Sequence, residues 1–389
     1  MSRFKQIGAL LQMSVRGIPQ RLVASLATAA GIACVVGVLV AMLSMGAGAR
    51  RMAMQNVRAD RAMVTTKGSQ SVFVSGLSAQ AVATIEDEPG IKRDADGKPL
   101  AAAYTLTQVD LYKKSNHVRS SSLLYGVSPR YFEVNPDVRI MAGRAFRPGL
   151  HELIAGKSRY EQFEGLEIGD KIRARGVDWT VVGRFTENGG SLENALLGDA
   201  DTVTSAFGRN NMQVVIAVLE SAAQFDAFAA TLKSDPAIDV DAKHEAEWAA
   251  AGAKGLTGIL NFISYFVGTV MALGASLGAL NVMYSIVDGR KRELATLRAI
   301  GFGGGPIMVS VLLESLLLAL PGALLGALLA WAWFNGSSVS PVGTSIKLVV
   351  TPALVAIGTL WALAIGLVGG FLPALRAARL PVATALRAT

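Results

Sequence analysis

The sequence predicts a membrane protein with four transmembrane α-helices, arranged 1+3, and a large α+β extracytoplasmic domain inserted between helices 1 and 2. Composition is the first observation: 51% of the residues are apolar, only 17% are charged, and the mean hydropathy is +0.41. Soluble proteins carry about 25% charged residues. The second observation is four stretches that reach the roughly 20 mainly apolar residues a helix needs to cross a bilayer. They are residues 22–47, 256–287, 306–334 and 348–373.

The placement of the basic residues predicts the orientation of these helices. Outside residues 48–254, every lysine or arginine except Lys347 lies before the first stretch, between the second and third, or after the fourth. Those places share one side of the membrane, and basic residues in short loops stay cytoplasmic. Both termini, including the tail 374–389, are therefore expected in the cytoplasm, with residues 48–254 and the short loop 335–347 on the opposite side of the membrane. The net charge of +8 follows from this topology and does not indicate nucleic-acid binding.

Residues 1–21 are expected to form an amphipathic helix at the membrane interface, in contact with lipid. Apolar residues recur there every three or four positions, at Phe4, Ile7, Leu11, Val15 and Ile18. The following stretch, 22–47, has the basic flank of a signal peptide. Its apolar run exceeds the 7–15 residues typical of a signal peptide, so a retained first transmembrane helix is the preferred interpretation.

Residues 48–254 alternate strand-like and helix-like patterns, which predicts an α+β domain. Residues 61–74 are expected to be extended, and Ser78 is expected to cap a helix over residues 79–86. Further expected elements are a hairpin over 171–185 that turns at Gly176, a strand over 214–219 and a helix over 221–232. The stretch 187–198 contains asparagine and glycine and is interpreted as a mobile surface loop.

The residues suggest no enzyme active site in this chain. Its one cysteine, Cys34, lies in an apolar run, and its three histidines are scattered without metal-ligand spacing. Within residues 48–254, neither Gly-x-Ser-x-Gly nor His-Glu-x-x-His occurs. Catalytic and metal-binding residues are therefore not expected.

The segment between the second and third membrane stretches, 288–305, has features beyond its charge. Asp288 is expected to cap a short helix that Gly301 ends, and Pro306 suits the first turn of the next helix. Leu294 and Leu297 would be exposed to water in such a short loop. This segment is therefore predicted to dock a cytoplasmic partner.

Residues 290–301 (Arg-Lys-Arg-Glu-Leu-Ala-Thr-Leu-Arg-Ala-Ile-Gly) and residues 370–387 together resemble two motifs of one family, the MacB/FtsX-like (type VII) ABC transporter permeases. The first segment resembles its coupling helix, and the second resembles its C-terminal motif. The inserted domain adds the family-like segments Gly126-Val-Ser-Pro-Arg-Tyr-Phe132, Gly143-Arg-Ala-Phe146 and Trp179-Thr-Val-Val-Gly183. The order and the 1+3 arrangement agree over residues 16–387.

The resemblance implies a permease that dimerises and binds cytoplasmic ABC ATPase subunits, and a homodimer is preferred over a heterodimer with a similar permease. This sequence has no Gly-x-x-x-x-Gly-Lys-[Ser/Thr], so ATP and Mg²⁺ are expected on a separate ATPase. A periplasmic adaptor and an outer-membrane channel are one setting that the resemblance implies. By resemblance, the ATPase-docking residues are Arg290, Lys291, Arg292, Glu293, Leu294, Leu297, Arg298, Ile300 and Gly301.

Polar and small residues inside the membrane stretches supply two further predictions. Glu314 lies about 12 Å into the third helix at 1.5 Å per residue, and Asn281 on the second helix is its expected hydrogen-bond partner. A proton relay is the alternative, but it would require more titratable groups than this region has. Small-residue faces that allow close helix packing are expected at Gly274, Gly278, Gly322, Gly326, Gly366 and Gly370.

The predicted function is a permease that couples ATP hydrolysis by a separate ATPase to motion of the extracytoplasmic domain. In the family this coupling is often mechanotransmission, used for efflux or extraction of a peptide, amphiphile or lipoprotein. The alternative is a transmembrane scaffold that activates a cell-wall hydrolase. The large inserted domain argues against that alternative, because the cell-division branch of the family has a smaller one.

Overall fold

The computed structural model describes residues 22–69, 72–339 and 345–380, with side chains described from Ser25 onward. The expected interfacial helix of residues 1–21 and the end of the tail therefore lie outside the described residues. The chain forms two units, which are treated separately below. The helical unit contains residues 1–48, 257–337 and 347–389, and the α+β unit contains residues 49–256 and 338–346.

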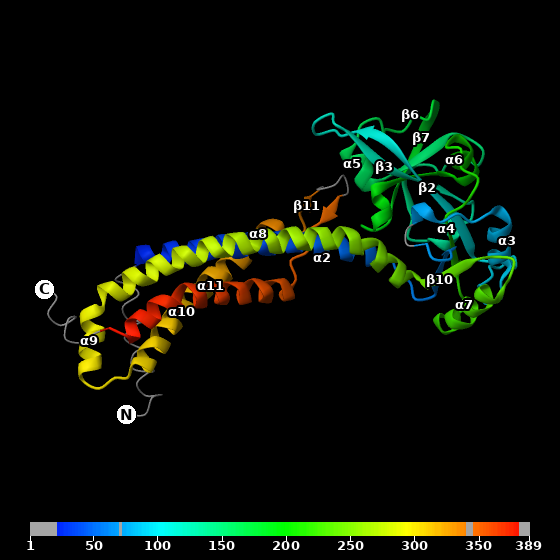
Figure 1. The fold of residues 1–389 in the computed structure, drawn as a ribbon. Helices are drawn as coiled ribbons and strands as arrows, with labels where there is room; N and C mark the ends of the chain where they lie inside the picture. The colour runs from blue at the N-terminus through cyan, green and yellow to red at the C-terminus, as the bar shows by residue number, and fades with distance from the viewer. Residues whose placement is uncertain (1–21, 70–71, 340–344, 381–389) are drawn as a thin grey trace. The chain divides into compact units, whose positions relative to one another are not determined.

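Each predicted membrane stretch corresponds to one long helix of the described chain (Figure 1). These helices are α2 (Leu22–Met54), α8 (Glu245–Gly289), α10 (Gly304–Phe334) and α11 (Pro352–Ala378). The helix α2 continues past Ala47, α8 begins before residue 256, and α11 continues past Pro373. A hydropathy pattern finds only the apolar part of a helix, whereas the backbone hydrogen bonds continue into its polar ends.

Close backbone contacts hold the helical unit together at several of the predicted glycines. A Cβ atom at Gly322 of α10 would lie 2.6 Å from the Ala29 carbonyl oxygen of α2, and one at Gly366 of α11 would lie 3.1 Å from Ala319 Cβ. A Cβ atom at Gly326 would clash with the backbone of Ala33, and one at Gly370 would clash with the side chain of Ser315. The missing side chains allow these helices to approach closely.

Gly274 and Gly278 behave differently from the other four glycines. Both lie on an exposed face of α8, where a Cβ atom at either position would have no described neighbour within 4 Å. The prediction that they pack against another helix is therefore wrong within this chain. The neighbouring positions Ala272, Ser276 and Ala279 supply the buried face of α8 instead, because they lie on the opposite side of the helical turn.

A matched pair of substitutions tests this difference. The change Gly326→Ala is expected to lower the stability of the helical unit by roughly 1–3 kcal/mol, because the new Cβ would lie 3.0 Å from Ala33 Cα and closer still to its carbonyl oxygen. In the monomeric chain, the change Gly274→Ala should be neutral or stabilising, since alanine is the better helix former. Thermal unfolding of the purified protein in nanodiscs measures both, and an equal midpoint for the two variants would contradict the assignment.

The α+β unit is built on a mixed sheet with strand order β10-β1-β9-β2-β3-β8-β5-β7-β4, with β6 paired to β7. The pairs β3–β8 and β5–β7 are parallel and the other pairs are antiparallel. The strands are β1 (Arg61–Thr66), β2 (Ala101–Tyr112), β3 (Arg119–Val127), β4 (Arg139–Gly143), β5 (Glu152–Gly156), β6 (Lys171–Ala174), β7 (Val177–Thr186), β8 (Ala195–Asp199), β9 (Val214–Val218) and β10 (Val240–His244).

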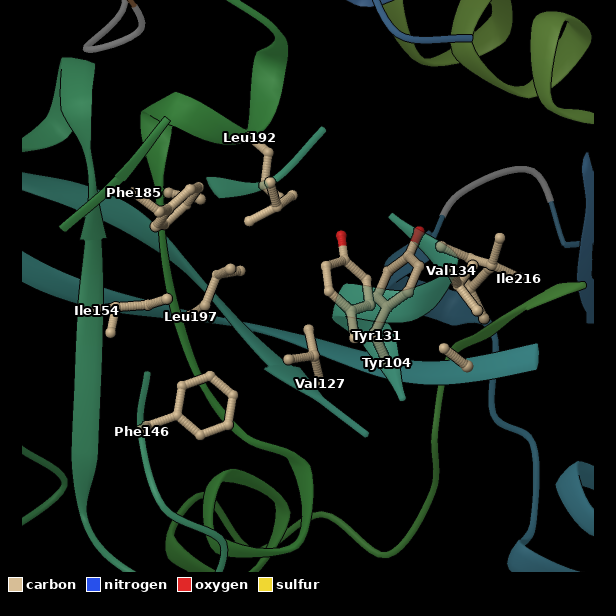
Figure 2. Close-up of a cluster of buried hydrophobic side chains, with 14 of the residues drawn as sticks. Tyr104, Val127, Tyr131, Val134, Phe146, Ile154, Phe185, Leu192, Leu197 and Ile216 are labelled. Carbon is tan, nitrogen blue, oxygen red and sulfur yellow. The ribbon is translucent and has the colours of Figure 1, made fainter. Parts of the chain in front are cut away.

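Short helices cover parts of this sheet. They are α3 (Ala79–Asp87), α4 (Tyr131–Val134), α5 (Lys157–Gln162), α6 (Ala200–Ala206) and α7 (Phe225–Ser234), with 3₁₀ turns η2 (Val72–Val74), η3 (Ser191–Asn194) and η4 (Ala222–Gln224). Figure 2 shows one of the buried clusters, in which Phe185, Leu197 and Ile154 of β7, β8 and β5 face the same interior. A small ribbon of β11 (Ser338–Val339) and β12 (Ile346–Lys347) follows α10.

Several predicted elements of this domain are confirmed. The Ser78 hydroxyl accepts a hydrogen bond from the Ala81 N–H and caps α3. The hairpin of β6 and β7 turns at Arg175 and Gly176, which have φ of 52° and 82°. Two residues with positive φ match a tight turn to the right-handed twist of the strands. The strand over 214–219 and the helix over 221–232 are also present, as β9 and as η4 with α7.

The prediction of a mobile surface loop over residues 187–198 is wrong. This segment forms a turn, then η3, and then β8, whose residues are all buried between β3 and β5. Glu193 fixes the turn, since its carboxylate accepts hydrogen bonds from the Glu187 and Gly189 N–H groups, each at 2.9 Å. Glu193, one of the polar residues that suggested a loop, therefore stabilises a turn through hydrogen bonds to its backbone. The apolar residues that follow form a strand in the middle of the sheet.

Candidate functional site

The predicted docking segment contains the short helix α9 (Lys291–Ala299), between α8 and α10. Figure 1 shows α9 following the end of α8 as a separate short helix. Asp288 does not cap α9, because α8 continues through it to Gly289 and its carboxylate lies 2.9 Å from Lys291 Nζ. Gly301 ends the segment with φ of 98°, a conformation that glycine adopts without strain. Pro306 lies in the first turn of α10, as predicted.

The inner face of α9 packs on the helical unit. Leu294 is 4% exposed and Ala295 is fully buried, and Leu294 joins a cluster with Val287 and Ile307. Leu297 is partly buried against the same cluster. The prediction that Leu294 would be exposed to water is therefore wrong. The chain folds α9 back on the ends of α8 and α10, so these leucines anchor the helix internally.

The outer face of α9 carries the exposed residues of the segment. Ile300 is 69% exposed, an unusual position for a large β-branched apolar side chain. The exposed positions next to it carry charged, hydroxyl and small side chains. We define the α9 outer face as Arg292, Glu293, Thr296, Ala299 and Ile300. Of the predicted docking residues, this face contains Arg292, Glu293 and Ile300.

The remaining predicted residues hold α9 in position. The Arg298 Nη1 donates a hydrogen bond to the Leu380 carbonyl oxygen at 2.7 Å, which ties α9 to the chain just beyond α11. Lys291 pairs with Asp288, and both side chains are partly exposed. These residues therefore set the orientation of the α9 outer face.

Glu314 is buried and forms an ion pair with Arg290. The Arg290 Nη1 lies 3.2 Å from Glu314 Oε2, with side-chain exposures of 12% and 8%. The Arg290 Nε donates to Glu293 Oε2 at 3.0 Å, so one guanidinium joins α9 to α10. A carboxylate inside an apolar helix needs such compensation.

The predicted partnership between Glu314 and Asn281 is wrong. Asn281 is exposed on α8, while Glu314 accepts a hydrogen bond from Arg290, a residue 24 positions earlier in the sequence. An arginine side chain is long enough to reach from the end of a helix into the apolar segment beside it. Arg290, near the start of the docking segment, was the signal in the sequence for this partner.

The α+β unit contains a cavity that was not predicted from the sequence. It has a volume of about 630 Å³ and is lined by residues from several elements. They include Met52 of α2, Tyr104 of β2, Trp248 of α8, and Glu187, which directly follows β7. These residues are far apart in the sequence, so no local pattern predicts that they share a cavity. Among the described residues, no group of His, Cys, Asp and Glu is arranged to hold a metal ion, there or elsewhere.

Glu187, a residue of the cavity wall, has a carboxyl pKa well above the usual value for glutamate. Burial raises the pKa of its carboxyl from 4.5 to about 7, hydrogen bonds from the Leu192 N–H and the Asn56 side chain oppose the rise, and the charges of Glu193 and Asp137 add to it. Between pH 4.5 and 7 the folded domain therefore holds this proton more tightly than the unfolded chain does. The free energy of unfolding is expected to fall as the pH rises through this range.

Thermal unfolding of the full chain across that pH range measures this effect. The variant Glu187→Gln should have a flatter dependence of the unfolding midpoint on pH, because the titrating group is gone. The control Glu161→Gln changes an exposed carboxyl away from the cavity and should keep the slope of the unchanged protein. A slope unaltered by Glu187→Gln would rule out Glu187 as its source.

Comparisons with known proteins cover both units. The family described as MacB-like periplasmic core domain matches residues 25–235, and the family described as FtsX-like permease C-terminal matches residues 265–382. The ABC transporter permease YknZ of Bacillus subtilis is 24% identical over 398 residues, which cover 97% of this chain and 98% of that protein.

Two MacB proteins are also similar. The macrolide export ATP-binding/permease protein MacB of Azoarcus is 24% identical over 391 residues, which cover 96% of this chain but 58% of that protein. The periplasmic region of MacB from Actinobacillus actinomycetemcomitans matches in structure with a TM-score of 0.39 at 12% identity, covering 50% of this chain and 93% of that one.

Proposed function

Because the chain belongs to the ABC transporter permeases with a MacB-like periplasmic core domain and an FtsX-like C-terminal domain, we propose that its α9 outer face docks an ABC ATPase and transmits ATP-driven motion to the α+β domain. The observation that carries the proposal is a short helix with a buried face and an outer face that exposes Ile300 beside charged side chains. Exposed apolar residues with a polar rim are typical of protein interfaces.

The attachment of α9 suits the transmission of movement. Its inner face is buried, Arg290 joins it to Glu314 of α10, and Arg298 joins it to the chain after α11. A displacement imposed on the outer face would therefore act on two membrane helices at once. Close packing makes such contacts stiff, so a small displacement is passed on.

The ATPase is proposed to be a separate polypeptide that binds ATP and Mg²⁺. The sequence contains no Gly-x-x-x-x-Gly-Lys-[Ser/Thr]. The name of the Azoarcus relative joins an ATP-binding protein to a permease, and this chain spans 58% of that longer relative. In the proposed orientation, both termini and α9 are cytoplasmic, and the α+β domain lies outside a bacterial inner membrane.

The other proposed partners follow from this arrangement. A second copy of the permease is proposed to form a homodimer through the exposed α8 face with Gly274 and Gly278, since small residues let membrane helices pack closely. A periplasmic adaptor and an outer-membrane channel are further proposed partners. The substrate class is a peptide, an amphiphile or a lipoprotein. The alternative of a scaffold for a cell-wall hydrolase is not favoured by the comparisons, in which relatives are named as transporter permeases or export proteins.

A cysteine cross-link to the ATPase tests the docking proposal. The single native cysteine is replaced in the variant Cys34→Ala, and Ala299→Cys then places a reactive thiol on the α9 outer face. The permease is reconstituted with its candidate ATPase and treated with a short thiol-to-amine cross-linker. A permease–ATPase adduct is expected from Ala299→Cys and not from Ala250→Cys, an exposed position on the α8 segment within the α+β unit. Equal yields from both positions, or none from Ala299→Cys, would contradict the assignment.

A further inference from the structure

The cavity of the α+β unit has the size of a site for a small molecule. Its volume of about 630 Å³ lies within the roughly 300–1,000 Å³ common for ligand pockets. All of its lining residues belong to this one unit. Much of the wall is apolar, through Met52, Met63, Leu123, Leu192, Ile216 and Leu256.

Three tyrosines of the wall, Tyr104, Tyr125 and Tyr131, form a tyrosine cluster. The ring of Tyr104 has its centroid 5.5 Å from that of Tyr125 and 6.4 Å from that of Tyr131, the latter edge to face. Figure 2 shows the hydroxyl groups of Tyr104 and Tyr131 directed to the same side, away from Val127. Trp248 lines the same cavity. Burial raises the pKa of Tyr125 to about 12, so this hydroxyl is neutral at physiological pH.

Contacts within the domain hold the two arginines that line the cavity, Arg61 and Arg159. Arg61 Nη1 lies 3.2 Å from Glu245 Oε1, and its Nη2 donates to the Val134 carbonyl at 2.7 Å. Arg159 donates to the Asn194 carbonyl at 2.7 Å and lies over the ring of Phe163, which is not a wall residue.

Glu187 is the wall carboxylate without a cationic partner. Its Oε2 accepts a hydrogen bond from the Leu192 N–H at 2.9 Å, and among the described residues no lysine, arginine or histidine pairs with it. The nearby charges of Glu193 and Asp137 are negative as well. The cavity therefore combines an uncompensated carboxyl, aromatic faces that attract cations, and apolar walls.

We propose that this cavity binds an amphiphilic amine, with its ammonium group between Glu187 and the tyrosine cluster and its apolar body against the methionine, leucine and isoleucine wall. A bound ammonium would supply the charge that Glu187 lacks and would favour its ionised form. The negative faces of Tyr104, Tyr125 and Trp248 would add cation–π attraction. An anionic amphiphile of the same length would be repelled by Glu187 and by the π faces.

Equilibrium dialysis with radiolabelled decyltrimethylammonium tests the site on the full-length permease in nanodiscs, with empty nanodiscs subtracted. Saturable binding is expected, and Ala249→Trp should weaken it at least about tenfold, because Ala249 lines the cavity. The control Ala250→Trp adds the same side chain one residue further along α8, where it does not line the cavity and is exposed. Equal affinities for these two variants would overturn the proposal.

A second variant and two probes test the role of charge without depending on a bulky substitution. Glu187→Gln should reduce the affinity for decyltrimethylammonium about tenfold, whereas Glu161→Gln should leave it unchanged. Decyl sulfate and decyl maltoside, which are anionic and neutral, should bind more weakly than the ammonium probe. Binding of decyl sulfate as tight as that of the ammonium probe would refute an amine site.

These binding measurements require no ATPase, so they stand apart from the docking proposal. That the bound amine is also a transported substrate rests on the function proposed above. Stimulation of ATP hydrolysis by the amine in the reconstituted complex, lost in Ala249→Trp and kept in Ala250→Trp, would support that part. Saturable binding without stimulation would support the site and contradict its role in transport.

Discussion

Replacement of Ile300 by aspartate is expected to remove the ATPase from the purified permease complex. Ile300 is 69% exposed on the α9 outer face, so its side chain contributes little to the fold and is free to fill an apolar pocket on a partner. Burying a carboxylate in such a pocket should cost at least about 2 kcal/mol, or a loss of affinity of about 30-fold. Co-purification through a tag on the permease, followed by quantification of the ATPase, measures the effect.

Two further variants separate docking from damage to the fold. Ile300→Ala removes the apolar contact without adding charge and should weaken the complex less than Ile300→Asp does. Ile168→Asp changes an exposed apolar side chain in the α+β unit and should leave the ATPase bound. Leu297→Asp is the less informative change, because Leu297 packs against the buried cluster of α9. If Ile300→Asp retained the ATPase as well as Ile168→Asp, the α9 outer face would not be the docking surface.

The second large effect is expected from Arg290→Ala. This change leaves Glu314, with a side chain 8% exposed, without its guanidinium partner. Removing one member of a buried ion pair typically costs about 3–5 kcal/mol, because the other charge stays desolvated. The unfolding midpoint should fall clearly, and ATP hydrolysis should respond less to substrate, since α9 would lose its link to α10.

A double-mutant cycle isolates the ion pair. Glu314→Gln keeps the shape of the side chain and removes its charge, so it should destabilise the protein less than Arg290→Ala does. The double variant Arg290→Ala/Glu314→Gln should be more stable than the sum of the single effects predicts, with a coupling of roughly 1–3 kcal/mol. Additive single effects would show that the two side chains do not depend on each other, whatever their distance.

Within the helical unit, these variants address two steps of one proposed mechanism. Ile300 concerns contact between the ATPase and α9, whereas Arg290 concerns contact between α9 and α10. A variant that keeps the ATPase bound but loses stimulated hydrolysis would locate the defect in the second step. The two outcomes are distinguishable because one changes the composition of the complex and the other changes its activity.

The sequence by itself determined the elements whose signal is local. Four apolar stretches predicted four long helices, Ser78 predicted the start of α3, and Gly176 predicted the turn between β6 and β7. The motifs at residues 290–301 and 370–387 predicted the family, which the comparisons show. Hydropathy, capping and turn conformation each depend on a few consecutive residues, so a linear pattern contains them.

Only the tertiary structure decided which residues meet. It buried Leu294 on the inner face of α9, paired Glu314 with Arg290 in place of Asn281, and left Gly274 exposed while Gly326 packs on α2. The physical reason is that burial and ion pairing depend on neighbours contributed by other segments, which a helical repeat does not specify.

The α+β unit shows the same division. The apolar residues after Asn194 have the composition of a strand, but the polar residues before them led to the interpretation of the whole stretch as a loop. The position of this strand, β8, between β3 and β5 depends on pairing with segments that are distant in the sequence. The cavity near Glu187 likewise exists only because α2, β2 and α8, which are far apart in the sequence, all contribute to its walls. Local patterns determined the four long helices and several elements of the α+β domain, and non-local packing decided which residues come together.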